Sequence, residues 1–226
     1  MISDECLIRM DKICCAYDDV VALSFFSAEI RKGETAVIMG PNGCGKSTLL
    51  KIMNGLIFPE QGEYLFGGTR IDRRSMADTA FARAFHQKLG YLFQNVDSQL
   101  FHNNVEDEIA FGPLQMGLDE SEAAKRTDDM IRMLDIEKLR RRAPYHLSTG
   151  EKKKVALASI LAVNPEVIVL DEPISGLDMI SQIWITDFLK QMKKAGRTIV
   201  IATHNEQFAE ELEDRRITMT NPIQQD

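Results

Sequence analysis

The chain has 226 residues, of which 44% are hydrophobic and 27% are charged, and its formal net charge is −7. This composition is that of an ordinary globular protein and excludes disordered and fibrous classes. Because sequence-independent binding of nucleic acid requires a cationic surface, the acidic balance also argues against DNA or RNA as a partner.

Targeting and redox signals are absent from the sequence. No apolar run approaches the roughly 18 residues that span a bilayer, and Asp4 and Glu5 stand where a signal peptide would carry positive charge. The four cysteines include no C-x-x-C pair, so neither a metal knuckle nor a disulfide framework is indicated. We therefore expect a cytoplasmic protein with reduced thiols.

The first part of the chain predicts strands, one glycine-rich loop and one helix. Residues 62–72 are typical of a hairpin with a turn at Gly67-Gly68, and the helix after the glycine-rich loop ends near Gly55. The strands are expected over 7–16, 25–30, 35–39 and 90–93.

The rest of the chain changes character twice. Residues 95–146 are polar and rich in helix signals, including Asp119 and Glu122 at the N-cap and N3 positions of a helix that runs to about Leu134. Beyond them, helices alternate with apolar strands, which predicts an α/β fold whose parallel sheet is covered on both faces. These elements are helix 149–163, strand 167–170, helix 180–195 and strand 198–202.

Residues 40–47 match the phosphate-binding P-loop pattern G-x-x-x-x-G-K-[ST]. The glycines let backbone N–H groups curl round phosphate oxygens, Lys46 adds a positive charge near the β and γ phosphates, and the hydroxyl of Ser47 is placed to bind Mg²⁺. The following helix directs the positive end of its dipole at the anion. An unliganded glycine-rich turn is the alternative, and it does not account for the buried strand before the loop and the helix after it.

Two further places carry candidate chemistry. Strand 167–170 ends in Asp171-Glu172, and parallel strands place ligands at their carboxyl ends, so we expect Asp171 to hold Mg²⁺ through water and Glu172 to polarise an attacking water. His204 follows strand 198–202. It has two open interpretations: a structural histidine, or a residue that reaches the γ-phosphate.

The segment 147–151 precedes a helix and also has two interpretations. Ser148 and Glu151 stand at the positions of a capping box. The segment is then either a capped helix with solvated Lys152, Lys153 and Lys154, or a helix end whose N–H groups bind an anion. The spacing alone does not choose between them.

The order of these motifs resembles the ATP-binding-cassette (ABC) ATPases over nearly the whole chain. The P-loop, Gln94, the 147–151 segment, Asp171-Glu172, the 175–178 segment and His204 follow one another as in that family. The resemblance implies an α/β P-loop NTPase with a RecA-like parallel-sheet core, an N-terminal antiparallel β portion and an inserted α-helical subdomain. It implies one domain, 1–226, with the nucleotide-binding core in 1–94 and 147–226 and the helical subdomain in 95–146.

The resemblance also implies ATP and Mg²⁺ as ligands and a role for each matched residue. Tyr17 would stack on adenine, Ser148 and Gly150 would contact the γ-phosphate bound by a second cassette, and Asp178 would cross the dimer interface. The implied catalytic residues are Glu172 as general base, His204 as switch histidine and Gln94. The implied metal residues are Ser47, Gln94 and Asp171, and the implied nucleotide contacts are Tyr17, Asn42, Gly43, Cys44, Gly45, Lys46, Ser47, Thr48, Ser148, Gly150 and Asp178.

The sequence departs from the family pattern at three positions. Thr149 and Glu151 replace the usual glycine and glutamine of the LSGGQ signature, and Asn205 stands where Asp commonly follows the histidine. Cys44 lies at a helix N-terminus, which lowers thiol pKa, and this raises the hypothesis of an oxidation-sensitive P-loop.

Residues 90–101, 105–113 and 117–118 further resemble the ATPases of energy-coupling-factor importers, the cobalt, nickel and vitamin type. This resemblance implies a transmembrane coupling subunit, a substrate-capture subunit, a homodimer or heterodimer of ATPases, and a peripheral position on the inner face of the cell membrane. Few residues follow His204, so we expect no C-terminal dimerisation region and a monomer or weak dimer without ATP. The alternatives are an ABC ATPase that serves another transporter class, a non-transport ABC ATPase, and another P-loop enzyme such as a kinase. No coiled-coil heptads of the kind that non-transport ABC ATPases carry occur between Gln94 and Ser148.

Overall fold

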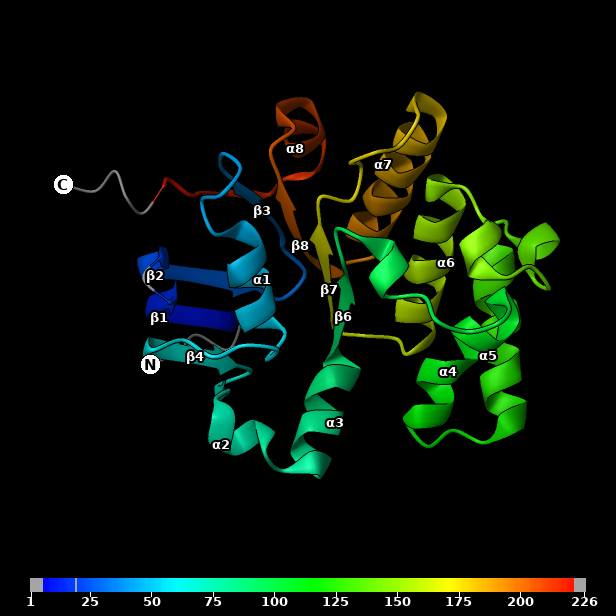
Figure 1. Ribbon diagram of the computed structural model, residues 1–226, viewed down its shortest axis with the longest axis horizontal. Coiled ribbons are helices and arrows are strands. Elements are labelled where there is room, and N and C mark those ends of the chain that lie inside the picture. The colour runs from blue at the N-terminus through cyan, green and yellow to red at the C-terminus, as the bar shows by residue number, and fades with distance from the viewer. Residues whose placement is uncertain (1–5, 19, 222–226) are drawn as a thin grey trace. The chain divides into compact units, whose positions relative to one another are not determined.

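The computed structural model describes residues 6–18 and 20–221, which separate into two compact units (Figure 1). The first unit combines the chain up to residue 86 with the chain from residue 186 onward, and the second spans 87–185. Helices α3 (Thr79–Lys88) and α7 (Met179–Lys194) have residues in both. The predicted division into a core and a helical subdomain at 95–146 stays a prediction.

An antiparallel sheet with the strand order β2-β1-β4-β5 occupies the first unit. The turn at Gly67-Gly68 is confirmed, and both glycines have positive φ, as a two-residue hairpin turn requires. The second strand starts at Val20 rather than at the predicted residue 25, because register shifts in its pairing with β1 hide the alternation. The strands are β1 (Cys6–Tyr17), β2 (Val20–Arg31), β4 (Gln61–Phe66) and β5 (Thr69–Arg70).

Three parallel strands complete the sheet structure of the first unit. Strand β3 (Thr35–Met39) lies between β8 (Thr198–Thr203) and β9 (Arg215–Thr218). Every residue of β3 and β8 is buried, as expected for continuous apolar strands covered on both faces. Helices α1 (Lys46–Met53) and α8 (Glu206–Leu212) contact these strands.

The second unit joins two parallel strands to a group of helices. Strand β6 (Leu89–Leu92) pairs with β7 (Val167–Asp171). Helices α4 (Val105–Gln115), α5 (Glu120–Met133) and α6 (Thr149–Ala162) contact one another and lie side by side in Figure 1. Helix α5 begins where predicted, because the carboxylate of Asp119 accepts a hydrogen bond from the backbone N–H of Glu122 at 2.9 Å.

Some elements have no counterpart among the predicted ones. They are α2 (Arg73–Met76), α3, α4, α8 and β9. Over residues 6–18 and 20–221, no helix is both long enough and apolar enough to cross a membrane.

Candidate functional site

The loop between β3 and α1 depends on glycines in left-handed backbone. Gly43 has φ +83° and Gly45 has φ +94°. A Cβ on Gly45 would lie 2.2 Å from the carbonyl oxygen of Ala22, so only glycine fits where the loop passes β2. A Cβ on Gly43 would have nothing within 4 Å, and Asn42 beside it is exposed, so this part of the loop faces open space.

Lys46 places a buried ammonium group inside this loop. Its Nζ donates hydrogen bonds to the carbonyl oxygens of Gly40 at 2.7 Å and Pro41 at 3.2 Å. The N-cap residue of α1 is Gly45, which supplies no side-chain acceptor to the first backbone N–H groups of the helix. Such N–H groups beside a lysine bind phosphate oxygens. The loop therefore fits the phosphates of a nucleotide, with Ser47 and Thr48 half-buried in the first helical turn.

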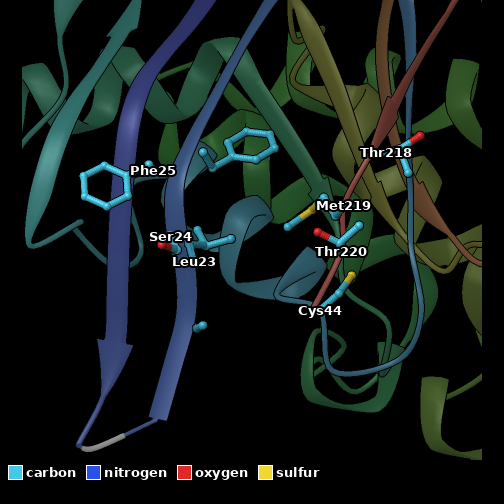
Figure 2. Close-up of a pocket in the computed structure, with 9 residues that line it drawn as sticks. Leu23, Ser24, Phe25, Cys44, Thr218, Met219 and Thr220 are labelled. Carbon is cyan, nitrogen blue, oxygen red and sulfur yellow. The ribbon is translucent and has the colours of Figure 1, made fainter. Parts of the chain in front are cut away.

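Cys44 lies beneath the loop rather than on its surface. The side chain is 1% exposed, and it lines a cavity of about 210 Å³ together with residues 22–26 of β2 and residues 218–220. Figure 2 shows Cys44 beside Met219 and Thr220, with the strand that carries Leu23 and Ser24 across the cavity. The thiol is therefore shielded from solvent although it borders a cavity.

His204 lies at the same sheet edge as the loop. Strands β3 and β8 are parallel, and Met39 is the register partner of Thr203. The loop that starts at Gly40 and the exposed His204 are therefore the next residues of two neighbouring strands. Asn205 then caps α8, because its side-chain oxygen accepts a hydrogen bond from the backbone N–H of Phe208 at 2.9 Å. Asn and Asp are equally good N-caps, which accounts for the tolerance of Asn here.

Tyr17 lies on the strand pair that flanks the loop. It is the last residue of β1, its register partner is Val20 of β2, and it is 45% exposed. Strand β2 is also the one that approaches Gly45. The first unit thus contains Tyr17, the P-loop and His204, of which the loop and His204 lie on neighbouring strand ends.

The second unit gathers Gln94, Asp171 and Glu172 at one strand edge. Leu92 of β6 is the register partner of Leu170 of β7, so the exposed Gln94 and the buried Asp171 and Glu172 follow the paired ends of two parallel strands. Glu172 has φ +46°, a left-handed backbone that is costly for a residue with a side chain.

Two side chains around this edge were not identified from the sequence. The hydroxyl of Tyr91 donates a long hydrogen bond to Oδ2 of Asp171 at 3.5 Å, and burial together with the charge of Asp171 raises the pKa of Tyr91. Gln99 accepts a hydrogen bond from the backbone N–H of Phe93 and donates one to the carbonyl of Tyr91, which fixes the chain just before Gln94. The contact of Tyr91 with Asp171 depends on the pairing of β6 with β7, whereas the contacts of Gln99 are local and depend on the turn after β6.

The start of α6 is a complete capping box, as the sequence predicts. Oε2 of Glu151 accepts hydrogen bonds from the backbone N–H of Ser148 at 2.8 Å and from its hydroxyl at 2.9 Å, while the backbone N–H of Glu151 donates to Oγ of Ser148 at 3.3 Å. The backbone hydrogen bond from Ser148 is the main cause that lowers the pKa of Glu151. The negative charge therefore points back to its own helix end.

Gly150 and Asp178 are both fixed by Ser181 of α7. A Cβ on Gly150 would lie 2.6 Å from Oγ of Ser181, so a side chain here would displace the hydroxyl that Asp178 accepts from. The carboxylate of Asp178 accepts hydrogen bonds from the backbone N–H of Ser181 at 3.0 Å and from its hydroxyl at 2.9 Å. These bonds lower the pKa of Asp178 and make it the cap of α7.

The interpretation of three solvated lysines after the capping box is wrong. Lys153 is 2% exposed, and its Nζ donates hydrogen bonds to backbone carbonyls of residues 172, 173 and 175. Lys152 forms an ion pair with Asp97 at 2.6 Å, and the ammonium of Lys154 lies 4.3 Å from the ring centre of Trp184. With a helical period, Lys153 lies on the same buried face as Ala156, Leu157 and Ile160. This spacing could have predicted its burial, but the run of three lysines suggested an exposed face.

The model of one protein family, described as ABC transporter, matches residues 23–175. The nickel import ATP-binding protein LarO of Lactiplantibacillus plantarum is 41% identical over 97% of this chain and 91% of its own length. The energy-coupling factor transporter ATP-binding protein EcfA of Methanococcus maripaludis is 42% identical over 83% of this chain and 66% of its own length.

Solved structures give the same result. CbiO1 from Clostridium perfringens, described as part of the ABC transporter complex CbiONQ, has a TM-score of 0.83 and 34% identity over 95% of this chain and 85% of its own. The ATP-binding cassette MJ0796, solved as a dimer bound to ADP and Pi, has a TM-score of 0.85 and 26% identity over 95% of both chains. These similarities confirm the predicted P-loop NTPase fold.

Proposed function

This chain belongs to the ABC transporter family of ATPases, and on that premise we propose that it is the ATP-hydrolysing subunit of an energy-coupling-factor importer for cobalt, nickel or a vitamin. Two cassettes would sandwich two ATP molecules and drive a transmembrane coupling subunit that works with a substrate-capture subunit. The proposal places the protein at the inner face of the cell membrane, bound through its partners.

The roles of the individual residues follow from the site geometry and the family resemblance. The register of Met39 with Thr203 carries this part of the proposal, because it sets a phosphate-binding loop and a histidine on neighbouring strand ends. Tyr17 would stack on adenine and residues 42–48 would bind the phosphates. Glu172 would accept the proton of the attacking water, and His204 would orient the γ-phosphate. Ser148, Gly150 and Asp178 would act across the dimer interface.

The metal residues that the family resemblance implies also carry the chemistry of a hard divalent cation's ligands. Ser47, Gln94 and Asp171 offer a hydroxyl, an amide oxygen and a buried carboxylate, which are oxygen ligands of the kind that Mg²⁺ prefers. Bound Mg²⁺ would neutralise charge on the β and γ phosphates.

The test of the ATPase proposal is dimerisation that depends on nucleotide. Glu172→Gln should block hydrolysis and therefore trap a dimer when ATP is added, which size-exclusion chromatography with light scattering detects. Glu172→Gln combined with Lys46→Ala is the matched control and should stay monomeric. A protein that is monomeric in both variants at millimolar ATP would contradict the proposed sandwich.

The importer part of the proposal is supported by an exposed aromatic cluster in the stretch that resembles energy-coupling-factor ATPases. Phe101 is 66% exposed, and its ring packs edge-on against Phe111 at 5.2 Å. The buried carboxylate of Glu108 accepts hydrogen bonds from the backbone N–H groups of Phe101 and His102, both at 2.8 Å, so the loop is held in place. A fixed exposed aromatic pair suits a partner surface.

Substitution of this cluster should separate hydrolysis from transport. Phe101→Ser should leave the ATPase rate of the isolated chain unchanged, whereas the membrane proteins that co-purify with a tagged chain should be lost. Tyr145→Ser, at an equally exposed aromatic side chain in the same unit, is the control. Retention of the same membrane partners by Phe101→Ser would contradict this surface, and an absence of transport subunits among the parent's partners would favour a non-transport ATPase.

A further inference from the structure

Lys153 is a charged side chain enclosed by protein. It lies on α6 just after the capping box, and its Nζ donates hydrogen bonds to the carbonyl oxygens of Glu172 at 3.2 Å, Pro173 at 2.7 Å and Ser175 at 2.8 Å. An ammonium group has three N–H donors, so these three carbonyls use its full capacity. Within residues 6–18 and 20–221, the hydrogen-bond partners of this ammonium group are thus backbone carbonyls of one short loop.

That loop is held in a conformation that it would not adopt readily alone. Glu172 has φ +46°, and the backbone N–H of Ser175 donates to the carbonyl of Glu172 at 3.1 Å, which closes a tight turn. Left-handed backbone is strained at a residue with a side chain, because Cβ comes close to the following carbonyl oxygen. The turn also directs three carbonyl dipoles at one point, and a cation at that point removes their mutual repulsion.

Burial of the Lys153 ammonium group is unfavourable, because the charged form loses its hydration. Burial lowers the pKa of Lys153 to about 8, and the nearby charge of Glu172 acts in the opposite direction. The charged form is therefore the main one at pH 7. A group buried at such a cost needs partners, and here the partners are the backbone that carries Glu172.

We infer that Lys153 is a positioning residue for ATP hydrolysis, which holds the 172–175 turn so that the carboxylate of Glu172 keeps its place at the end of β7. The inference rests on the proposed role of Glu172 as the base. Lys153 itself touches only backbone in these contacts, so it acts through Glu172 rather than on the substrate.

The first experiment compares Lys153→Met with Lys154→Met. Both remove an ammonium group from adjacent residues of one helix, but Lys154 lies over the ring of Trp184 instead of the turn. Lys153→Met should lower kcat about 10- to 100-fold with KM for ATP within twofold of the parent, since misplacement of a reacting group by about 1 Å has effects of this size. Lys154→Met should keep the parent rate. Lys153→Gln retains two N–H donors and should recover part of kcat.

Thermal unfolding and a double variant exclude a merely structural role. If Lys153→Met lowers Tm but leaves kcat per folded molecule unchanged, the inference is overturned. If Lys153 acts through Glu172, Lys153→Met should not lower further the slow residual rate of Glu172→Gln in single-turnover hydrolysis, whereas independent losses would multiply. Should Lys153→Met not fold, Lys153→Gln carries the same comparison.

The two proposals fail in different ways. A parent-like rate for Lys153→Met beside an inactive Glu172→Gln would remove the positioning role and leave the base intact. A parent-like rate for Glu172→Gln would remove the base, and with it the reason for the positioning role.

Discussion

The capping box at the start of α6 should contribute to the stability of the fold, and its hydrogen bonds allow the size of this contribution to be estimated. Replacement of Glu151 by Ala removes a carboxylate that accepts two hydrogen bonds from Ser148. A hydrogen bond to a charged group contributes about 1.5–3 kcal/mol when buried, and partial exposure reduces this to about 1 kcal/mol. Loss of a negative charge from the first helical turn adds about 0.3–1 kcal/mol. We therefore expect the free energy of unfolding to fall by about 1–2 kcal/mol in urea denaturation at pH 7.5.

The same interaction fixes the sign of the pH dependence. Because the hydrogen bond from Ser148 lowers the pKa of Glu151 in the folded state, the unfolded chain binds the proton more tightly. The contribution is fully present above the unfolded value of 4.5 and is lost as the pH falls through the lower folded value. The stability difference between parent and Glu151→Ala should therefore shrink below about pH 4.5.

Two control variants separate the hydrogen bonds of Glu151 from the effect of its charge on the helix dipole. Glu120→Ala removes a charge from the first turn of α5, where Asp119 is the cap, so it should lose only the smaller dipole contribution. Glu151→Gln keeps an oxygen acceptor without the charge and should lie between parent and Glu151→Ala. A stability difference for Glu151→Ala that is near zero at pH 7.5, or that stays constant down to pH 3.5, would refute the reasoning.

Three substitutions test the phosphate-binding part of the site. Lys46→Ala removes the ammonium from the loop and should abolish ATP binding in calorimetry while the fold, followed by circular dichroism, remains. Gly45→Ala should weaken ATP binding by at least tenfold, because its Cβ would lie 2.2 Å from the carbonyl of Ala22; unchanged affinity would show that the loop can shift. His204→Ala should bind ATP within twofold of the parent and turn over at least 100-fold more slowly, and a parent rate would make the catalytic assignment wrong.

The strands next to the site could be predicted because each is a short run of apolar residues, as expected for a strand buried on both faces. Residues 35–39 were predicted and found as β3, and 167–170 and 198–202 were each found one residue longer. By contrast, β9 carries two arginines, and only its pairing with β3 makes it a strand. Helix α3 was not predicted, although its apolar side chains follow a helical period and the carboxylate of Asp78 accepts hydrogen bonds from the backbone N–H groups of Ala80 and Phe81 in its first turn.

Among the site residues, too, those marked by a local sequence pattern could be predicted, whereas those defined by contacts between distant parts of the chain could not. The P-loop, the Ser148–Glu151 capping box and the positions of Gln94 and Asp171 at strand ends follow from patterns within a few residues. The partners of Lys153 lie about 20 residues away along the chain. Because they are backbone carbonyls, no pattern of side chains predicts them.

The contacts of the three successive lysines of α6 contribute different amounts to the free energy of folding. These differences determine which neighbouring segment is coupled most strongly to the helix. Lys152 pairs with Asp97, which is 65% exposed, so this ion pair contributes about 0–1 kcal/mol and is screened by salt. The Lys154–Trp184 contact contributes about 0.5–1 kcal/mol at a partly exposed position. Lys153 alone is enclosed, and its removal leaves buried carbonyl oxygens without their donor, which costs about 1–3 kcal/mol. A displacement of α6 is therefore coupled most strongly to the turn that carries Glu172, and only weakly to the segment after Gln94. It follows that high salt should weaken the Lys152 contact while leaving the dependence of turnover on Lys153 intact.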